Sequence, residues 1–331
     1  MKIMVYEARP DERADLEKQA ALHGVELSVT DAVPTLENAS LAAGCIGVSI
    51  LGQGCIDAAL LDAYHALGIR YLSTRTIGYD HIDLDHARSI RLRVCIASYA
   101  PNGVADFTVM MILMCLRHYK QALWRGQVND FSLTGLQGRE MKDLTIGIIG
   151  TGRIGAQVAR NLSGFGCRIL AYDLRRNPAV EPQVTYVDFD TLLAQSDVIT
   201  LHMPLLDSNR HIINRESVAK MRDGVVIVNC SRGELADIEA LIEGIETGKI
   251  GALGMDTVEG DEGIIHADHR VDILPNRNWF YLHQFRNVIM TQHMAFYTDA
   301  AVSSMVDCGI GGICQMAAGE SCPTELTGPV Q

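Results

Sequence analysis

The stretch LTIGIIGTGRIGAQVARNLSGFG, residues 144–166, carries the strongest indication of the fold in this chain. An apolar, strand-like run leads directly into Gly150, Gly152 and Gly155, and a helical pattern follows at once. Glycines in this G-x-G-x-x-G spacing allow a tight turn and let a pyrophosphate approach the backbone at a helix N-terminus. The context of strand, turn and helix therefore predicts a dinucleotide-binding site.

An acidic residue supports the same interpretation. The next apolar run, CRILAYD, ends in Asp173. A carboxylate at this distance from the glycines accepts hydrogen bonds from a ribose diol and repels a 2′-phosphate. Arg175 and Arg176 lie close enough in sequence to weaken that repulsion. The pattern predicts a Rossmann domain that binds NAD in preference to NADP.

Alternating strand and helix patterns extend from this motif in both directions. One series occupies residues 1–98, and a second begins at residue 144 and continues through VVIVNC and GALGMD. Such alternation is typical of parallel strands joined by crossover helices. A last helical stretch runs from Thr298 to about residue 317 and is expected to fold back on the first series. We therefore predict an α/β fold with two doubly wound parallel-sheet domains: a discontinuous, flavodoxin-like substrate-side domain (residues 1–99 plus 299–331) and a Rossmann NAD-binding domain (residues 100–298).

Composition narrows the class of partner. The chain has 331 residues, of which 48% are hydrophobic, and a net charge of -12. The negative charge argues against nucleic acid and anionic membranes and favours a small-molecule substrate. The first residues are too polar for a signal peptide, and the densest apolar run, VMMILMCL, is too short to cross a bilayer, so we expect a cytoplasmic protein. Nine cysteines without a CxxC pair predict neither disulfides nor zinc.

Three stretches that follow predicted strands carry groups suited to catalysis. They are VNCSRGEL with Arg232, MDTVEGDEG at residues 255–263, and MTQHMAFYTD with His293. Singly, these would be a turn arginine, a solvated acidic loop and a core histidine. At the carboxyl ends of parallel strands they converge on one ligand crevice. Arg232 can then hold a 2-oxo acid, His293 can protonate its carbonyl oxygen as hydride arrives, and a carboxylate can keep the histidine charged.

Seven stretches follow one another along the chain: STRTIGYDHID, SYAPNGVADFTVMMILMCLR, GIIGTGRIG, LHMPL, VNCSRGEL, GKIGALGMDTVEG and QHMAFYTDAAV. In this order the chain resembles the D-isomer specific 2-hydroxyacid dehydrogenases over nearly its whole length. Within that family the first two stretches look most like D-lactate dehydrogenases, including the type associated with vancomycin resistance. The segment LTGLQGREMKDLTIGIIGTGRIG looks equally like aryl-lactate dehydrogenases.

The resemblance implies roles for individual positions. Backbone N–H groups of Ile77 and Gly78 would bind the substrate carboxylate, and Asp256 would contact the nicotinamide carboxamide. The implied catalytic residues are Arg232, Asp261 and His293, and the implied substrate-binding residues are Ile77, Gly78, Tyr99, Phe296 and Tyr297. The implied cofactor-binding residues are Gly150, Gly152, Arg153, Ile154, Gly155, Asp173, His202, Pro204, Asn229, Cys230 and Asp256.

Two departures from the family pattern concern the catalytic groups. The family usually carries E-x-E, whereas here Glu259 is followed by Gly260 and Asp261, one methylene short of glutamate. Glu262 is the alternative carboxylate, because a one-residue shift of the loop would bring it to the histidine. Gln292 stands where a proline usually precedes the histidine.

The resemblance implies an NAD-dependent reductase of 2-oxo acids, with pyruvate and D-lactate as the leading pair. An aryl or branched-chain substrate is the alternative, and a nucleotide-sensing, corepressor-like binding protein is the alternative of another class. The Met-rich helical stretch from Pro101 to about Lys120 favours a homodimer, although it also suits an ordinary core helix. No metal is expected, since a helix start at Asp83 explains the DHIDLDHA cluster and a polar loop explains His266 and His269.

Overall fold

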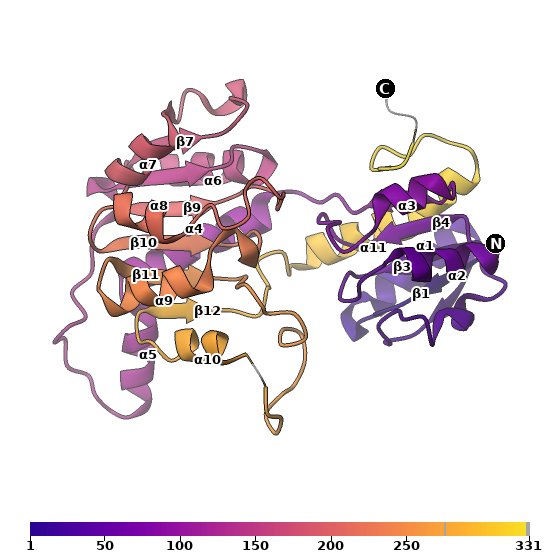
Figure 1. The fold of residues 1–331 in the computed structure, drawn as a ribbon, viewed down its shortest axis with the longest axis horizontal. Coiled ribbons are helices and arrows are strands. Elements are labelled where there is room, and N and C mark those ends of the chain that lie inside the picture. The colour runs from indigo at the N-terminus through magenta and orange to yellow at the C-terminus, as the bar shows by residue number, and fades with distance from the viewer. Residues whose placement is uncertain (275, 329–331) are drawn as a thin grey trace. The chain divides into compact units, whose positions relative to one another are not determined.

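The structure, a computed structural model, describes residues 1–274 and 276–328 (Figure 1). The chain forms two units, unit 1 (Met1–Ala100 with Tyr297–Gln331) and unit 2 (Pro101–Phe296). The expected domain boundaries lay after residues 99 and 298. The last three residues of the expected first domain, 329–331, lie outside the described residues.

Unit 1 is built on a five-stranded parallel sheet in the order β2-β1-β3-β4-β5, the flavodoxin-like order. Its strands are β1 (Lys2–Val5), β2 (Glu26–Val29), β3 (Gly47–Ile50), β4 (Tyr71–Thr74) and β5 (Arg93–Ile96). Its helices are α1 (Arg13–His23), α2 (Ala58–Ala66), α3 (Leu84–Ser89) and α11 (Asp299–Ala317), with short 3₁₀ turns η1 (Pro10–Glu12) and η2 (Ala39–Ala42).

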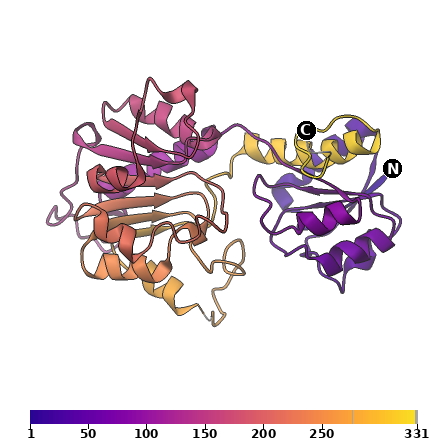
Figure 2. The same cartoon turned by 45° about the horizontal axis from the view of Figure 1, so that its top comes forward.

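The C-terminal helix α11 completes the core of unit 1. It begins after Thr298, whose side chain caps the N–H of Ala301, and it contacts α1, β4 and β5 (Figures 1 and 2). Small residues permit the close approach, because a Cβ at Gly312 would lie 2.7 Å from the sulfur of Cys95. At 19 residues and a mean hydropathy of 1.2, α11 has the length and composition of a membrane span, but half of it is buried inside unit 1.

Unit 2 is built on a seven-stranded parallel sheet in the order β12-β11-β10-β9-β6-β7-β8. Its strands are β6 (Thr145–Ile149), β7 (Arg168–Tyr172), β8 (Thr185–Tyr186), β9 (Val198–Leu201), β10 (Val225–Asn229), β11 (Ile250–Met255) and β12 (Val288–Met290). Its helices are α4 (Asn102–Leu116), α5 (Tyr119–Gln127), α6 (Arg153–Ser163), α7 (Phe189–Gln195), α8 (Arg215–Lys220), α9 (Ile238–Glu246) and α10 (Arg277–His283), with 3₁₀ turns η3 (Met141–Asp143), η4 (Pro178–Val180) and η5 (Gly233–Leu235).

The strand order positions the functional loops of unit 2. Every residue of the central strands β9 and β10 is buried, as expected for a parallel sheet covered by helices on both faces. The order reverses between β6 and β9, and ligands bind outside the carboxyl ends of strands at such a switch point. The predicted fold class, two doubly wound α/β domains, is confirmed.

One predicted element is wrong in its extent. The sequence indicated a single helix from Pro101 to about Lys120, but α4 ends at Leu116 and α5 begins at Tyr119. His118, between them, has a φ of +50°, which interrupts the helical backbone. Its ring nitrogen Nε2 lies 3.1 Å from the carbonyl oxygen of Gln137, so a contact with a distant loop supports the break.

Candidate active site

The glycine-rich turn has the geometry that a pyrophosphate site needs. Gly150 has a φ of +94°, and a Cβ there would lie 2.6 Å from the carbonyl oxygen of His202. A Cβ at Gly155 would collide with the carbonyl of Gly150, whereas nothing lies within 4 Å of a Cβ at Gly152. Gly152 precedes the first turn of α6 and leaves open space beside it, and the N-terminus of a helix carries the partial positive charge that favours an anion. Arg153 and Ile154 form that first turn.

Asp173 fixes this turn from the end of β7. Its Oδ2 accepts hydrogen bonds from the backbone N–H of Thr151 at 2.6 Å and from the Thr151 hydroxyl at 3.0 Å. Tyr186 and Asn177 complete the network, since the Tyr186 hydroxyl donates to Thr151 Oγ1 and the Asn177 amide donates to the Thr151 carbonyl. Arg176 lies over the Tyr186 ring at 5.5 Å. Thr151, Asn177 and Tyr186 were not anticipated from the sequence.

His202 follows β9 and is almost completely buried. Its Nε2 lies 3.0 Å from the Thr200 hydroxyl, and burial lowers the pKa of its ring to about 3. The ring is therefore neutral at physiological pH, with one N–H and one acceptor nitrogen, and is unsuited to act as a general acid. Among the described residues its buried Nδ1 has no hydrogen-bonding partner, which leaves one polar atom for a ligand beside the glycine turn. The neighbouring Pro204 is exposed.

Asn229 shapes the loop that carries Arg232 after β10. The Asn229 side chain is fully buried, accepts the N–H of Ser231 at 3.0 Å and donates to the carbonyl of Arg232 at 2.7 Å. The Arg232 guanidinium donates to the carbonyl of Ser231 at 2.9 Å. Cys230 is buried, and burial raises the pKa of its thiol, so it is a packed thiol rather than a nucleophile.

Asp256, at the end of β11, supports the loop that carries His293. Its carboxylate is 1% exposed and accepts hydrogen bonds from the hydroxyl of Thr291 at 2.6 Å and from the backbone N–H groups of Met294 at 2.9 Å and Ala295 at 2.8 Å. These donors flank His293, which has a φ of +52°. The carboxylate thus holds the Thr291 side chain before a left-handed histidine and the backbone after it, and sequence reasoning did not foresee this contact.

The carboxylates of the acidic stretch at residues 255–263 differ in their partners and in their burial. Glu259 accepts hydrogen bonds from Arg210 at 2.9 Å and from the Nε2 of His211 at 2.7 Å. Asp261 is half-buried, and its Oδ2 accepts the N–H of Val258 at 3.1 Å. Burial raises the pKa of Asp261 to about 6, the charges of nearby acids add to this rise, and the Val258 N–H opposes it. Glu262 is exposed.

The remaining predicted residues lie mostly on unit 1. Ile77 and Gly78 are half-buried in the loop after β4, where the Gly78 carbonyl accepts the Thr76 hydroxyl at 2.6 Å. Tyr99 is half-buried after β5. Tyr297 also belongs to unit 1, and the Arg9 guanidinium lies 5.2 Å above its ring, whereas Phe296 is the last residue of unit 2.

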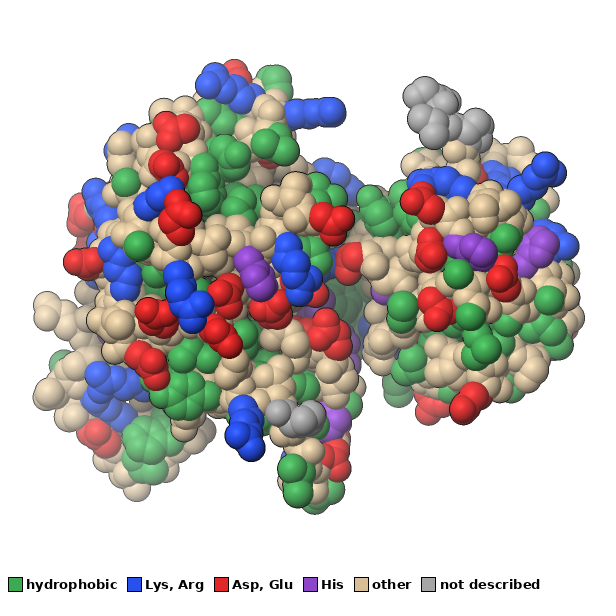
Figure 3. Space-filling model, in the orientation of Figure 1, with side chains coloured by type: hydrophobic (Ala, Val, Ile, Leu, Met, Phe, Trp, Pro, Cys, Tyr) green, Lys and Arg blue, Asp and Glu red, His purple; other side chains and the backbone are tan. Residues whose placement is uncertain are grey.

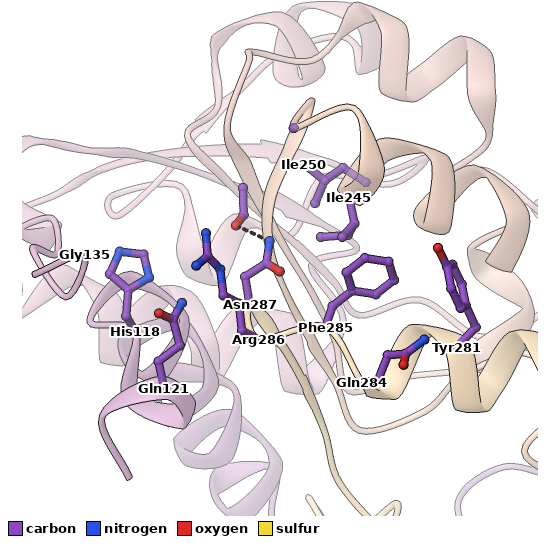
Figure 4. A pocket seen from close by; sticks show the side chains of 12 residues that line it. His118, Gln121, Gly135, Ile245, Ile250, Tyr281, Gln284, Phe285, Arg286 and Asn287 are labelled. Carbon is purple, nitrogen blue, oxygen red and sulfur yellow. Dashed lines mark hydrogen bonds between the residues drawn. The ribbon is translucent and has the colours of Figure 1, made fainter. Parts of the chain in front are cut away.

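A separate cavity of about 730 Å³ lies on unit 2, away from these residues. Figure 4 shows His118, Ile250, Phe285 and Asn287 around it, with the Asn287 amide donating to the carbonyl of Gly251. Ile250 begins β11 and Asn287 precedes β12, so this cavity lies at the amino edge of the sheet. The glycine turn, Arg232, Asp256 and His293 all follow carboxyl ends, so the cavity is not the catalytic site.

No group of three His, Cys, Asp or Glu side chains within residues 1–274 and 276–328 is arranged to hold a metal ion. In the DHIDLDHA stretch, Asp83 caps α3 and His86 pairs with Asp62 at 2.8 Å. The nine cysteines are free thiols.

The chain is similar to known proteins along most of its length. Residues 109–295 match the family described as D-isomer specific 2-hydroxyacid dehydrogenase, NAD binding domain. An aromatic 2-oxoacid reductase of Clostridium sporogenes is 41% identical over 93% of each chain. The D-lactate dehydrogenase of Escherichia coli K12 is 36% identical over 98% of this chain and 100% of that one. The NAD-complexed D-isomer specific 2-hydroxyacid dehydrogenase of Lactobacillus delbrueckii ssp. bulgaricus is 30% identical, with a TM-score of 0.83 over 98% of this chain and 100% of that one.

The sheet order, the glycine turn and Asp173 define the class of NAD-binding dehydrogenases. The chain belongs to the D-isomer specific 2-hydroxyacid dehydrogenase family. The predicted enzyme class, an NAD-dependent D-2-hydroxyacid dehydrogenase, and the predicted cofactor are confirmed.

Proposed function

We propose that the chain reduces a 2-oxo acid to the D-2-hydroxy acid with NADH, using groups at the carboxyl ends of three neighbouring strands. Arg232 follows β10, Asp256 and Asp261 follow β11, and His293 follows β12, and these strands are adjacent in the sheet. The observation that carries the proposal is the Asp256 carboxylate, which fixes the loop around His293 through three hydrogen bonds. A rigid loop of this kind suits a general acid.

The residues of unit 2 divide the chemistry between them. NADH, when held by the glycine turn and Asp173, supplies the hydride that adds to the carbonyl carbon. The Arg232 guanidinium holds the 2-oxo acid by paired hydrogen bonds. The His293 ring transfers a proton to the carbonyl oxygen and takes it back in the reverse reaction. Asp261 orients His293 and stabilises its charged form, with Glu262 as the alternative carboxylate.

Unit 1 is proposed as the substrate-side domain, in which Ile77, Gly78 and Tyr99 contact the substrate. Pyruvate is the leading candidate substrate, because the sequence resembles D-lactate dehydrogenases and the E. coli relative is named a D-lactate dehydrogenase. An aromatic 2-oxo acid is the second candidate, since the 41% identical relative is named an aromatic 2-oxoacid reductase. Both share the same chemistry at the carbonyl, so side-chain contacts decide between them.

The proposal is tested by NADH oxidation with pyruvate, 2-oxoisocaproate, phenylpyruvate, indolepyruvate and 2-oxoglutarate. Turnover of any of these contradicts the corepressor-like alternative, and absence of turnover with all of them contradicts the proposal. Arg232→Lys replaces a planar fork with a point charge and should lower kcat/KM about 100-fold or more while NADH still binds. Activity within a few-fold of wild type would exclude Arg232 as the substrate anchor.

A homodimer is proposed from an apolar surface on unit 2. Exposed large hydrophobic side chains gather on α5 and the segment after it, including Leu123, Trp124, Phe131 and Leu133. In Figure 3, hydrophobic side chains are visible at the α5 end of the unit, among charged and other side chains. Several large hydrophobic side chains exposed on neighbouring segments favour an interface, and a second copy is the simplest partner. Light scattering that shows only monomer at micromolar concentration contradicts the dimer.

The free thiols and the use of NADH support a cytoplasmic location.

A further inference from the structure

A second histidine lies beside His293 on unit 2. His266 is exposed in the loop after β11, and its Nε2 lies 3.3 Å from the carbonyl oxygen of His293. Because a carbonyl oxygen only accepts hydrogen bonds, Nε2 carries the hydrogen and donates it. His266 therefore contacts the backbone of the residue to which we assign the proton transfer.

His266, His293 and Phe296 form an aromatic cluster. The ring centroids of His266 and His293 are 6.1 Å apart, and those of His266 and Phe296 are 6.4 Å apart with the rings nearly perpendicular. The rings of His293 and Phe296 are 6.3 Å apart and also perpendicular. Edge-to-face packing at these separations is the arrangement that aromatic rings prefer.

The backbone shows that the loop is shaped to place this ring. His266 has a φ of +63°, in the left-handed region that most residues avoid. The preceding turn is closed by the N–H groups of Ile264 and Ile265, which both donate to the carbonyl of Asp261. Asp261 and His266 therefore lie on one ordered loop. A left-handed residue that is not glycine is costly, and such outliers concentrate where a side chain must point in a functional direction.

We propose that His266 is a specificity-determining residue that, with Phe296, receives the aryl side chain of an aromatic 2-oxo acid. A substrate whose carbonyl oxygen is hydrogen-bonded to His293 has its side chain only a few bonds away from these two rings. A phenyl or indolyl ring reaches them and adds a fourth aromatic ring to the cluster, whereas the methyl group of pyruvate does not. This inference rests on the proposed reduction of 2-oxo acids and names the class of side chain that the site selects.

The test compares substrates that differ only in aromaticity. Phenylpyruvate and cyclohexylpyruvate have similar volumes, and pyruvate serves as the short substrate. His266→Asn removes the ring and keeps an amide donor, and asparagine tolerates the left-handed backbone. We expect kcat/KM for phenylpyruvate to fall about 2- to 13-fold, the equivalent of about 0.5–1.5 kcal/mol for one aromatic contact. The kcat/KM values for cyclohexylpyruvate and pyruvate should stay within twofold of wild type, which corresponds to roughly 0.4 kcal/mol.

His269→Asn is the matched control, because His269 lies on the same loop but pairs with Asp272 at 2.8 Å. This variant should leave all three substrates unchanged. An equal loss for all three substrates in His266→Asn would mean that the residue only supports the loop, and no loss would place the aryl group elsewhere. A loss confined to 2-oxoglutarate would identify a carboxylate subsite instead. Each of these results overturns the inference, whereas a wild-type enzyme that reduces no 2-oxo acid overturns the proposed function itself.

Discussion

Two histidines at the carboxyl edge of the unit 2 sheet differ in their burial and in the groups that surround them. His202 is almost completely buried beside Thr200, and burial lowers the pKa of its ring to about 3. His293 is half-buried on a loop that Asp256 holds through hydrogen bonds. Burial removes the first histidine from acid–base chemistry, whereas a supported and accessible loop suits the second histidine to it.

The largest expected effect separates these two histidines directly. His293→Gln removes the proposed general acid and should lower kcat about 100- to 10,000-fold. His202→Gln keeps a polar atom where Nε2 meets Thr200, so kcat should stay within a few-fold and only the KM for NADH should rise. Steady-state kinetics with saturating 2-oxo acid and varied NADH measure kcat and the KM for NADH of both variants. Similar losses of kcat in the two variants would contradict separate roles for His202 and His293.

The second prediction concerns the support of His293. Asp256→Asn places an amide group where the carboxylate accepts three hydrogen bonds, so at least one buried N–H loses its partner. The free energy of unfolding should fall by about 1–3 kcal/mol. The loosened loop should lower kcat about 10- to 100-fold, because a small misplacement of a catalytic group is costly. Urea unfolding and kcat are measured on the same preparation. A stable variant with full kcat would show that His293 needs no such support.

The third prediction concerns cofactor binding at Asp173, which follows β7 at the same edge of the sheet. Asp173→Ala should raise the KM for NADH about tenfold, the equivalent of about 1.4 kcal/mol, and should narrow the preference for NADH over NADPH. Asn177→Ala is the control, since it also loosens the turn at Thr151 but leaves the carboxylate in place. That variant should keep the cofactor preference. Equal use of the two cofactors by the wild type would contradict the role of Asp173.

The smallest expected effect is a change in pH dependence at Asp261. Its pKa is raised to about 6, so its negative charge is present above that pH and is lost as the pH falls through it. Reduction should therefore decline below about pH 6, because a protonated Asp261 carboxyl no longer stabilises a charged histidine. Asp261→Asn should abolish this acid-side decline at a lower overall rate. Asp261→Glu, with a longer reach to the histidine, should move the alkaline decline upward.

Profiles of kcat/KM against pH for these variants and for Glu262→Gln decide which carboxylate acts. If Asp261→Asn keeps the wild-type profile while Glu262→Gln loses activity, Glu262 is the orienting group.

The sequence predicted the glycine turn well because its determinants are local. Gly150, Gly152, Gly155 and the strand before them lie within a dozen residues, and backbone sterics alone require glycine at Gly150 and Gly155. The break at His118 was missed because neither glycine nor proline marks it. A left-handed histidine supported by a distant carbonyl leaves no pattern in the sequence.

The support of the catalytic loop was also beyond the sequence. Asp256 and Ala295 are 39 residues apart, and only the pairing of β11 with β12 brings them together. His266 was interpreted as part of a polar loop because its ring contacts depend on two left-handed residues that composition does not reveal. The resemblance to the family identified the candidate residues, but their physical partners required the fold.

The position of α11 has a consequence for the order in which the chain folds during synthesis. Residues such as Ile3, Val5 and Cys95 share a core cluster with Ile310 and Ile313 of α11, although unit 2 lies between them in the chain. At ribosomal rates of about 5–20 residues per second, the first segment waits roughly 10–40 s for the helix that covers it. Unit 2 is continuous and can fold meanwhile. We therefore expect nascent chains stalled before residue 299 to bind chaperones through the uncovered face of the first sheet, and crosslinking to such chaperones should cease once α11 has emerged.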